Sequence, residues 1–444
     1  MTTTTNAHVG RLVCSAVKLV SLAALVLMAG TYASAGGAGG EQEGSTIVVD
    51  TNAVFPPPGM SGSPKTCVTT PFLAAYKSIQ AAVNAASAGA LILVCPGNYP
   101  ELVSINKSLT LRGTIDLAGN AGAPVITLPN GGSGVVANYS YFSLANGSGF
   151  APAVAQVLIQ AANVTIANLA VDASNTYTTC SVPSLIGILY TTGSSGSVNR
   201  AAVRNQSSQA GGLYCSTGPA PTPVGIGILA DNTGAVSILN SSIRGFDYAG
   251  IAWGGTLGHV TVDNDTVIGI AQGATCSNIL LEGVGGGQVS HNTVASCSEF
   301  GIYVTFATQA VAISGNDVST TAAQGGFALD IYLELNRAAV TISHNKIAGG
   351  SLGVGVNAFS LVQTSPGATI QDNHISGVES GIADFAGGGT ISGNIISGVY
   401  FGIYAGGDVV SGNTINDALA GVCCVAAGST VSGNTYLNVT TLAE

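Results

Sequence analysis

Residues 340–347 read VTISHNKI, and this short phrase recurs through the second half of the chain. Its later variants are ATIQDNHI at 368–375, GTISGNII at 389–396, DVVSGNTI at 408–415 and STVSGNTY at 429–436. The phrase asparagines from Asn316 to Asn434 follow one another at steps of 29, 28, 21, 19 and 21 residues. A coil of three short strands needs about that many residues, and self-similarity at such a period is typical of a solenoid.

Within the phrase, apolar and polar side chains alternate, which predicts a β-strand with one buried face. A second short strand follows it, as in GIYV at 301–304 and GIYA at 402–405. Stacked coils would bury a continuous apolar column, and each coil would pair with the next at roughly 4.8 Å. We therefore predict an all-β fold, a single-stranded right-handed parallel β-helix.

The repeated asparagines fall at matching turns of successive coils. Buried amides in register can satisfy one another and nearby backbone groups, so we expect them to form a ladder with a structural role. The expected members are Asn168, Asn205, Asn240, Asn264, Asn292, Asn316, Asn345, Asn373, Asn394, Asn413 and Asn434.

The first residues have the pattern of an export signal. Arg11 and Lys18 lie before the apolar run at 19–28, and the small residues of 33–35 follow it. We expect a signal peptide at 1–35, an N-terminal extension at 36–66 and the β-helix at 67–444. The apolar run is short for a membrane span, so we expect no membrane insertion and a secreted, periplasmic or cell-surface protein.

Nine cysteines occur, and eight of them follow the expected signal peptide. An even number in an exported chain indicates disulfides. Order along the chain favours three pairs: Cys67 with Cys95, Cys180 with Cys215, and Cys276 with Cys297. The adjacent Cys423 and Cys424 are left unassigned, because a bridge between neighbours strains the backbone. The chain has no C-x-x-C spacing, so we expect no metal site.

Charge narrows the class of partner. The chain has 11 basic and 21 acidic residues, for a formal net charge of −10. Nucleic-acid binding depends on clustered Lys and Arg, so we expect no nucleic-acid partner. The sequence does not indicate an oligomeric state.

The segment at 76–113, YKSIQAAVNAASAGALILVCPGNYPELVSINKSLTLRG, resembles the opening of right-handed β-helix proteins of the pectin-lyase-like superfamily. That superfamily includes pectin methylesterases and periplasmic NosD-like proteins, and the likeness includes Gly97, Tyr99 and Glu101 as G-x-Y-x-E. Apolar residues at helical spacing predict a short helix at about 76–87, which would cap the open end of the column. The esterase segments D-F-I-F-G and G-R-P-W are absent. The resemblance implies the fold and leaves the activity open.

One set of polar residues is a candidate site. When the second strands of the coils are aligned, Asp231, Glu282, Glu334 and Asn357 fall in one outward column, and Tyr303 and Tyr332 fall in the next. Carboxylates beside exposed tyrosine rings suit a sugar-binding groove. Glu282 and Glu334 are the catalytic candidates, two coils or roughly 9–10 Å apart, near the upper end of the separation in inverting glycosidases. Substrate-binding candidates are Asp231, Tyr303, Tyr332 and Asn357.

Two functions from different classes remain. The first is binding, with or without cleavage, of an extracellular polysaccharide, and long steps between Asn168, Asn205 and Asn240 supply loops that could wall a groove. The second is a noncatalytic surface or periplasmic protein for structure or adhesion. A hydrolase would use the carboxylates, whereas a lyase would need a basic residue such as Arg337 or Lys346. We expect no cofactor, with Ca²⁺ as the one alternative.

Overall fold

The computed structural model describes most of the chain beyond its first 44 residues. The described ranges are 45–54, 66–68, 74–115, 122–143, 149–174, 184–207, 224–255, 258–270, 276–297, 299–320, 328–349, 353–359 and 366–443. The expected signal peptide, the Cys180–Cys215 pair and much of the long loops lie outside the described residues. Residues 42–444 form one compact unit. No helix among the described residues is long and apolar enough to cross a membrane.

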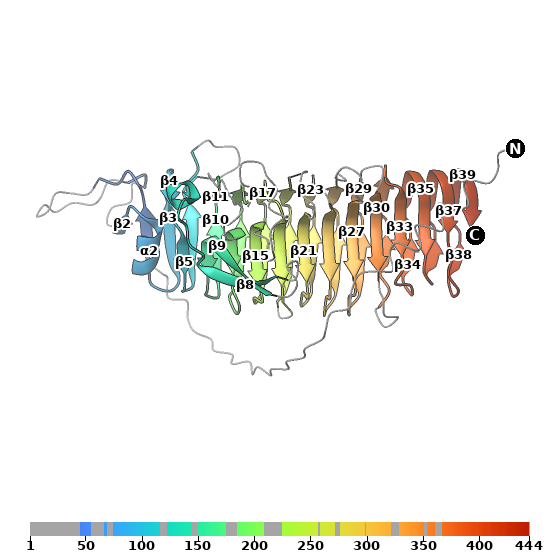
Figure 1. Cartoon of the computed structure of the whole chain (residues 1–444), viewed down its shortest axis with the longest axis horizontal. Coiled ribbons are helices and arrows are strands. Elements are labelled where there is room, and N and C mark those ends of the chain that lie inside the picture. Colours follow the sequence, from blue (N-terminus) through green and yellow to red (C-terminus); the bar gives the residue numbers. More distant parts are fainter. Residues whose placement is uncertain are drawn as a thin grey trace, which may run out of the picture. The chain divides into compact units, whose positions relative to one another are not determined.

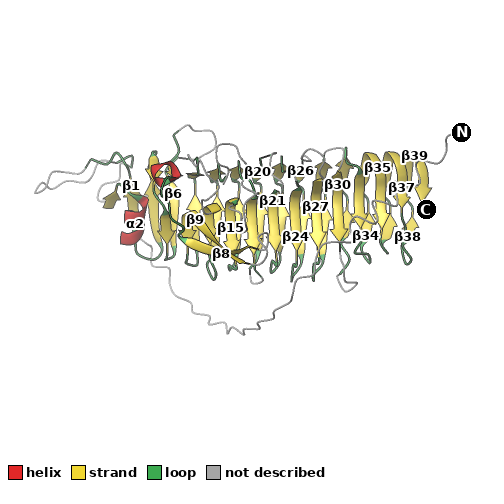
Figure 2. Ribbon diagram, in the orientation of Figure 1, coloured by secondary structure: helices red, strands yellow, loops and turns green. Residues whose placement is uncertain are grey.

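The unit is a right-handed parallel β-helix in which each coil contributes strands that pair with the coils before and after it (Figure 1). Strands make up nearly all of its regular structure (Figure 2). One coil, for example, consists of β25 (Val311–Ser314), β26 (Asp317–Ser319) and β27 (Ala328–Glu334). The prediction of an all-β solenoid is confirmed.

The repeated phrase forms the first sheet. Its strands run in the order β2 (Ala74–Tyr76), β1 (Thr46–Val49), β3 (Ala90–Val94), β6 (Leu109–Gly113), β10 (Val164–Ala167), β13 (Gly196–Asn199), β16 (Val236–Leu239), β19 (Val260–Asp263), β22 (Gly287–Ser290), β25, β28 (Val340–Ser343), β31 (Thr369–Gln371), β34 (Thr390–Ser392), β36 (Val409–Ser411) and β38 (Thr430–Ser432). Strand β1 pairs in parallel with β3, so the first sheet includes residues that precede residue 67. The sequence analysis had placed the start of the β-helix at residue 67.

Each coil then adds a short and a longer strand. The short strands are β11 (Ala170–Asp172), β14 (Ala202–Arg204), β17 (Ser242–Arg244), β20 (Thr266–Ile268), β23 (Thr293–Ala295), β26, β29 (Lys346–Ala348) and β32 (His374–Ser376). The longer strands are β9 (Gly149–Ile159), β12 (Ser184–Tyr190), β15 (Gly225–Asp231), β18 (Ala249–Gly254), β21 (Ser277–Glu282), β24 (Phe300–Thr305), β27, β30 (Gly353–Phe359) and β33 (Ser380–Asp384). The last coils join the two as β35 (Ile395–Ala405), β37 (Thr414–Cys423) and β39 (Thr435–Ala443).

The remaining elements lie in the first coils. They are the helix α2 (Ile79–Ala85), the strands β4 (Asn98–Pro100), β5 (Val103–Ile105), β7 (Val125–Thr127) and β8 (Tyr139–Ser143), and a 3₁₀ turn, η1 (Pro129–Gly132). Strand β8 pairs antiparallel with β9.

The core is a column of Ile, Val and Leu that passes through every coil. In the first sheet, Ile313 lies in register with Ile342, and Ile342 with Ile370; all three are fully buried. Stacking like on like keeps neighbouring side chains in van der Waals contact along the column. The apolar positions of the repeated phrase are therefore the inward positions.

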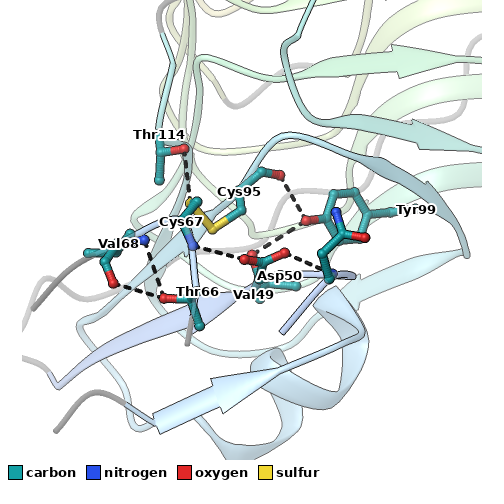
Figure 3. The surroundings of a disulfide bond; sticks show 9 residues. Val49, Asp50, Thr66, Cys67, Val68, Cys95, Tyr99 and Thr114 are labelled. Atoms are coloured by element: carbon teal, nitrogen blue, oxygen red, sulfur yellow. Dashed lines mark hydrogen bonds between the residues drawn. A yellow bond between two sulfur atoms is a disulfide. The ribbon is translucent and has the colours of Figure 1, made fainter. Parts of the chain in front are cut away.

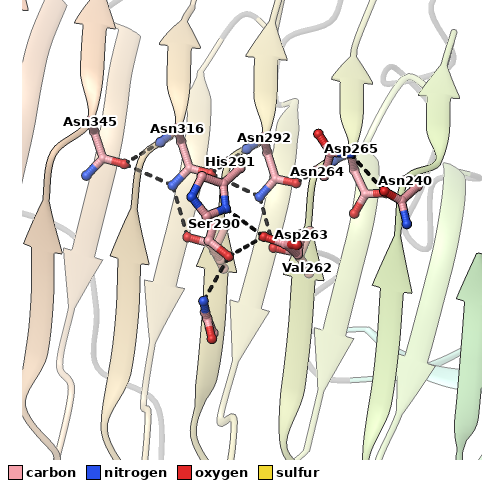
Figure 4. A network of polar contacts seen from close by, with 12 residues as sticks. Asn240, Val262, Asp263, Asn264, Asp265, Ser290, His291, Asn292, Asn316 and Asn345 are labelled. Carbon is pink, nitrogen blue, oxygen red and sulfur yellow. Dashed lines mark hydrogen bonds and ion pairs between the residues drawn. The ribbon is translucent and has the colours of Figure 1, made fainter.

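An asparagine ladder lines the turn after the first sheet (Figure 4). Asn345 is typical: its Nδ2 donates to Oδ1 of Asn373 at 2.9 Å and to the carbonyl of Ile313 at 3.0 Å. Its Oδ1 accepts from the backbone N–H and the Nδ2 of Asn316. The same pattern continues to Asn434, so the prediction is confirmed from Asn292 onward.

The four earlier asparagines do not belong to this ladder. Asn168, Asn240 and Asn264 occupy the residue before the ladder position, where φ is 52–57°. An asparagine tolerates this left-handed conformation well. Nδ2 of Asn264 also donates to Oδ1 of Asn240 at 2.8 Å, and Nδ2 of Asn240 to Oδ1 of Asn199 at 3.1 Å, so these amides form a second, exposed row of side-chain hydrogen bonds. Asn205 lies in another turn, where its Nδ2 donates to Asp172. In these coils the ladder position holds other residues, among them Ser241 and Asp265.

Helix α2 covers the first coils at the expected place. Its N-cap Ser78 accepts from the N–H of Ala81, and the carboxylate of Glu101 accepts from Ser78 Oγ at 2.7 Å and from the N–H groups of Ile79 and Gln80 at 2.7 and 2.9 Å. A negative charge is favourable at a helix N-terminus. The glutamate of the G-x-Y-x-E segment is therefore a structural capping residue.

Two of the expected disulfides are present. Cys67 and Cys95 are joined with their Cα atoms 5.8 Å apart, and Cys276 is joined to Cys297 at 5.3 Å. Asp50 accepts from the N–H of Cys67 at 2.8 Å beside the first bridge (Figure 3). Both bridges tie segments of consecutive coils together, which restricts the unfolded chain.

Candidate functional site

The candidate residues lie on the outward side of the longer strands β15 to β27. Backbone register places Asp231, Gly254, Glu282, Thr305 and Glu334 side by side on consecutive strands. A carboxyl group therefore occurs on every second coil of this column. At roughly 4.8 Å per coil, adjacent carboxyl-bearing positions are about 10 Å apart along the stack.

A second outward column holds the tyrosines. Leu280, Tyr303 and Tyr332 are in register, as the alignment predicted. The next residue of this column is Asn357, which the sequence had placed beside Glu334. Phe359 takes that place instead. The doubled pattern GVGV at 353–356 offers two registers that differ by two residues, and alternation alone cannot separate them because both bury the same faces. A role of Asn357 in binding remains a prediction.

Three aromatic rings form a patch beside the carboxyl groups. The ring centroids of Phe300, Tyr303 and Tyr332 lie 4.8–5.3 Å from one another, and the rings of Phe300 and Tyr332 are nearly parallel. Each is half-buried, so part of the patch faces solvent. Phe300 was missed by the sequence analysis. It lies two residues before Ile302, where a local irregularity of the strand brings it back to the outward side.

The two catalytic candidates differ in environment. Glu334 accepts a hydrogen bond from the hydroxyl of Tyr303. Glu282 makes no side-chain hydrogen bond among the described residues, and burial together with the charge of Glu334 raises its pKa to about 7. Between them, Thr305 is buried. One carboxyl group of the pair thus holds its proton near neutral pH, while the other is hydrogen-bonded as an acceptor.

Two more carboxyl groups flank this pair. Burial raises the pKa of Glu299 to about 7. Burial also raises the pKa of Asp231, although the hydroxyl of Tyr139 donates to it at 2.9 Å. Glu299 precedes β24 and Tyr139 belongs to β8, so neither falls in the repeated phrases that guided the alignment. We call the surface formed by Asp231, Glu282, Glu299, Glu334, Phe300, Tyr303 and Tyr332 the acidic face.

Strand β8 determines where the acidic face begins. Tyr141 and the half-buried Tyr139 pack on an apolar outward cluster that includes Leu189, Leu229 and Ala252. Leu189, Leu229 and Ala252 belong to the same column that holds Tyr303 two strands later. The outward columns are therefore apolar where β8 covers them and become acidic and aromatic beyond it. The hydrogen bond from the hydroxyl of Tyr139 to Asp231, the first carboxyl group of the acidic face, lies at this boundary.

The two basic candidates, and the cluster of residues closest to a metal-site geometry, lie away from the acidic face. Lys346 is on the short strand β29, where its Nζ lies 3.1 Å from Asp317, and Arg337 is exposed in the turn after β27. Within the described ranges, the group with metal-like proximity is Asp50, Cys67 and Cys95, whose two sulfurs form a disulfide. That group does not fit a metal ion, and Ca²⁺ as a cofactor remains a prediction.

Comparison with known proteins agrees with the architecture. A family model described as right handed beta helix region matches residues 225–396. A comparison with curated proteins gives no match. The chain has a right-handed parallel β-helix fold.

Similar solved structures include XylC in complex with xylose, which is 12% identical with a TM-score of 0.50 over 89% of this chain and 86% of that one. The A-module of mannuronan C-5 epimerase AlgE6 from Azotobacter vinelandii is 16% identical with a TM-score of 0.42, over 82% and 90%. The Dettilon tailspike protein is 14% identical with a TM-score of 0.43, over 79% and 62%, so this β-helix spans less than two thirds of the tailspike. At these identities the likeness concerns the fold alone.

The acidic face of this β-helix can serve two chemical purposes. Its rings offer an apolar surface, and its carboxyl groups offer hydrogen-bond acceptors and, where protonated, donors. The pairing of a carboxyl group that retains its proton with one that accepts a hydrogen bond also matches the needs of acid–base catalysis.

Proposed function

We propose that the protein binds an extracellular polysaccharide on the acidic face. The observation that supports this most directly is the aromatic patch of Phe300, Tyr303 and Tyr332 beside a column of carboxyl groups. Sugar rings present apolar faces that pack on aromatic rings, and their hydroxyls donate to carboxylates. Few other ligands need both contacts repeated along a surface.

The spacing favours a chain that lies across the strands. Carboxyl-bearing positions recur on every second coil, from Asp231 through Glu282 to Glu334. A linear polymer running along the stack would meet an equivalent acceptor at regular intervals of about 10 Å. Gly254, between Asp231 and Glu282, has open space where a side chain would be, and leaves room for the polymer.

A hydrolytic step is the second candidate function. Glu282, with its pKa raised to about 7, would protonate the leaving oxygen, and Glu334 would act as the base that activates water. Residues two strands apart are separated by roughly 10 Å of backbone, near the upper end for inverting enzymes. The hydrogen bond from Tyr303 would hold Glu334 in place for this role. A lyase is less well supported. Its candidate base Lys346 is ion-paired with Asp317, and both residues belong to the short strands β26 and β29 and not to the longer strands of the acidic face.

The expected location of the protein also supports polysaccharide binding. The signal-like segment at 1–35 and the disulfides Cys67–Cys95 and Cys276–Cys297 favour a secreted, periplasmic or cell-surface location, where polysaccharides are encountered. The competing proposal is a noncatalytic structural or adhesive protein in which the acidic face has no ligand.

Binding to a glycan array, followed by a reducing-end assay on each glycan bound, tests this proposal. Tyr332→Ala and Glu334→Gln should weaken binding, whereas Asp317→Asn, which removes a carboxylate from a different strand set, should not. Reducing ends that appear with the unmodified protein and not with Glu282→Gln would establish hydrolysis. Absence of binding to every glycan, or equal binding by all variants, would contradict the proposal and favour the structural alternative.

A further inference from the structure

In the described part of the chain, none of the four carboxyl groups of the acidic face has a basic partner. Among the described residues, the Arg and Lys ion pairs are Arg204 with Asp172 and Lys346 with Asp317, and neither pair is part of the face. The hydrogen bonds of the face come from the tyrosine hydroxyls of Tyr139 and Tyr303. The uncompensated charge of the face therefore has the same sign as the net charge of −10 on the chain.

This charge pattern is unsuited to an anionic ligand. A polymer that lies along the column would place its sugars next to Asp231, Glu282 and Glu334 in turn. A uronate or sulfated sugar would then bring a further negative charge against the ionised members of this column, and no Arg or Lys of the described residues pairs with them. Like charges brought together at an interface oppose binding and suppress wrong partners.

The hydrogen-bonding groups of the face suit uncharged and amino sugars instead. Sugar hydroxyls and ammonium groups both donate to carboxylates. The rings of Tyr303 and Tyr332 contact apolar sugar faces and also attract cations. Burial of Glu282 and Glu299 without a counter-charge favours their protonated forms, in which they can donate to a neutral sugar oxygen.

We infer that the acidic face takes linear glycans without carboxylate or sulfate groups and rejects polyuronates. This inference rests on the proposed function, of which it defines the substrate class.

The test compares polymers that share a backbone and differ in charge. Pectate would be measured against fully methyl-esterified pectin, and alginate against its propylene glycol ester, beside neutral glycans and a glucosamine polymer. We expect the anionic member of each pair to bind roughly tenfold more weakly or worse, a difference of about 1.4 kcal/mol or more. Raising the ionic strength should narrow the gap, because salt screens charges that face solvent.

A charge-reduced variant provides the internal control. At about pH 8.5, above their pKa of about 7, Glu282 and Glu299 are ionised, and Glu282→Gln/Glu299→Gln should then bind pectate and alginate more readily than the native protein does. Asp317→Asn/Asp372→Asn, which removes two charges elsewhere, should leave the discrimination unchanged. Tighter binding of pectate or alginate than of the matched ester would overturn the inference while leaving a polysaccharide-binding function intact. Failure of every polymer to bind would overturn both.

Discussion

The backbone N–H of Asp265 donates to Oδ1 of Asn292 at 2.9 Å, which places Asp265 in the asparagine ladder one coil before its first asparagine. The carboxyl group of Asp265 takes over the acceptor role, since its Oδ1 accepts from the N–H of Ser241 at 2.6 Å. Its Oδ2 is buried without a partner, where an asparagine would have a donor. Burial raises the pKa of Asp265 to about 8.

Asp265→Asn should therefore stabilise the protein. The new Nδ2 would donate to Asn292 as Asn292 does to Asn316, a gain of about 1 kcal/mol for a net hydrogen bond. In the native protein the folded state keeps a proton that the unfolded state releases, so stability falls as pH rises from about 4 to about 8. Urea unfolding across this range should show the largest gain at pH 8. An exposed control, Asp317→Asn, should show no comparable gain, and a variant no more stable than the native protein at pH 8 would contradict this account of the ladder.

Asn345→Ala should have the opposite effect. The substitution leaves the backbone N–H of Asn316 without an acceptor inside a buried turn. It also removes one of two hydrogen bonds of Asn316 Nδ2, which keeps the carbonyl of Val289, and one of two donors to Asn373 Oδ1, which keeps the backbone N–H of residue 345. An unsatisfied buried N–H costs roughly 1–3 kcal/mol. Thermal melting should fall clearly, whereas Thr341→Ala, outward on the same coil, should change it little. Glycan binding should persist at temperatures at which the variant is still folded, and loss of binding without loss of stability would refute a purely structural ladder.

The sequence determines the coil far better than the turn that joins its strands. Alternation identified Ile342 and Ile370 as inward residues because burying one face is a strong, repeated constraint. It did not separate the ladder residue from the residue before it, since both positions accept asparagine. The ladder position uses its buried amide, and the position before it uses its tolerance of positive φ together with exposed amide hydrogen bonds. Asn264 and Asp265 show the consequence: the visible asparagine is outside the ladder, and the ladder residue is an aspartate.

The acidic face was only partly predictable for a related reason. Glu282, Tyr303, Tyr332 and Glu334 follow from strand register, which repeats. Tyr139 reaches Asp231 from β8, an antiparallel strand outside the repeats, and such a tertiary contact leaves no periodic signal in the sequence.

Glu101→Gln should destabilise the first coils. The carboxylate accepts from two N–H groups of α2 and from Ser78 Oγ, and hydrogen bonds to a charged group are worth roughly 1.5–3 kcal/mol each. Glutamine keeps the shape, loses the charge and replaces one acceptor with a donor. Amide hydrogen exchange at Ile79 and Gln80 should accelerate more than exchange at Ile342, far along the stack. Equal acceleration at both places, or none at either, would show that Glu101 is not a local cap.

Burial, and to a smaller extent the charge of Glu334, should keep Glu282 protonated up to about pH 7. Burial and that nearby charge raise the pKa of Glu282 from 4.5 to about 7, so its carboxyl group stays protonated below pH 7 and ionises above it. A ¹³C NMR titration of Glu282 should show a midpoint near 7. Glu334→Gln removes the charge and leaves the burial, so the midpoint should fall toward the ordinary value without reaching it, while Asp317→Asn should not move it. Any hydrolysis should decline above pH 7, as expected when the general acid loses its proton. A midpoint near 4.5, or one that Glu334→Gln leaves in place, would show that the two carboxyl groups do not act as a pair.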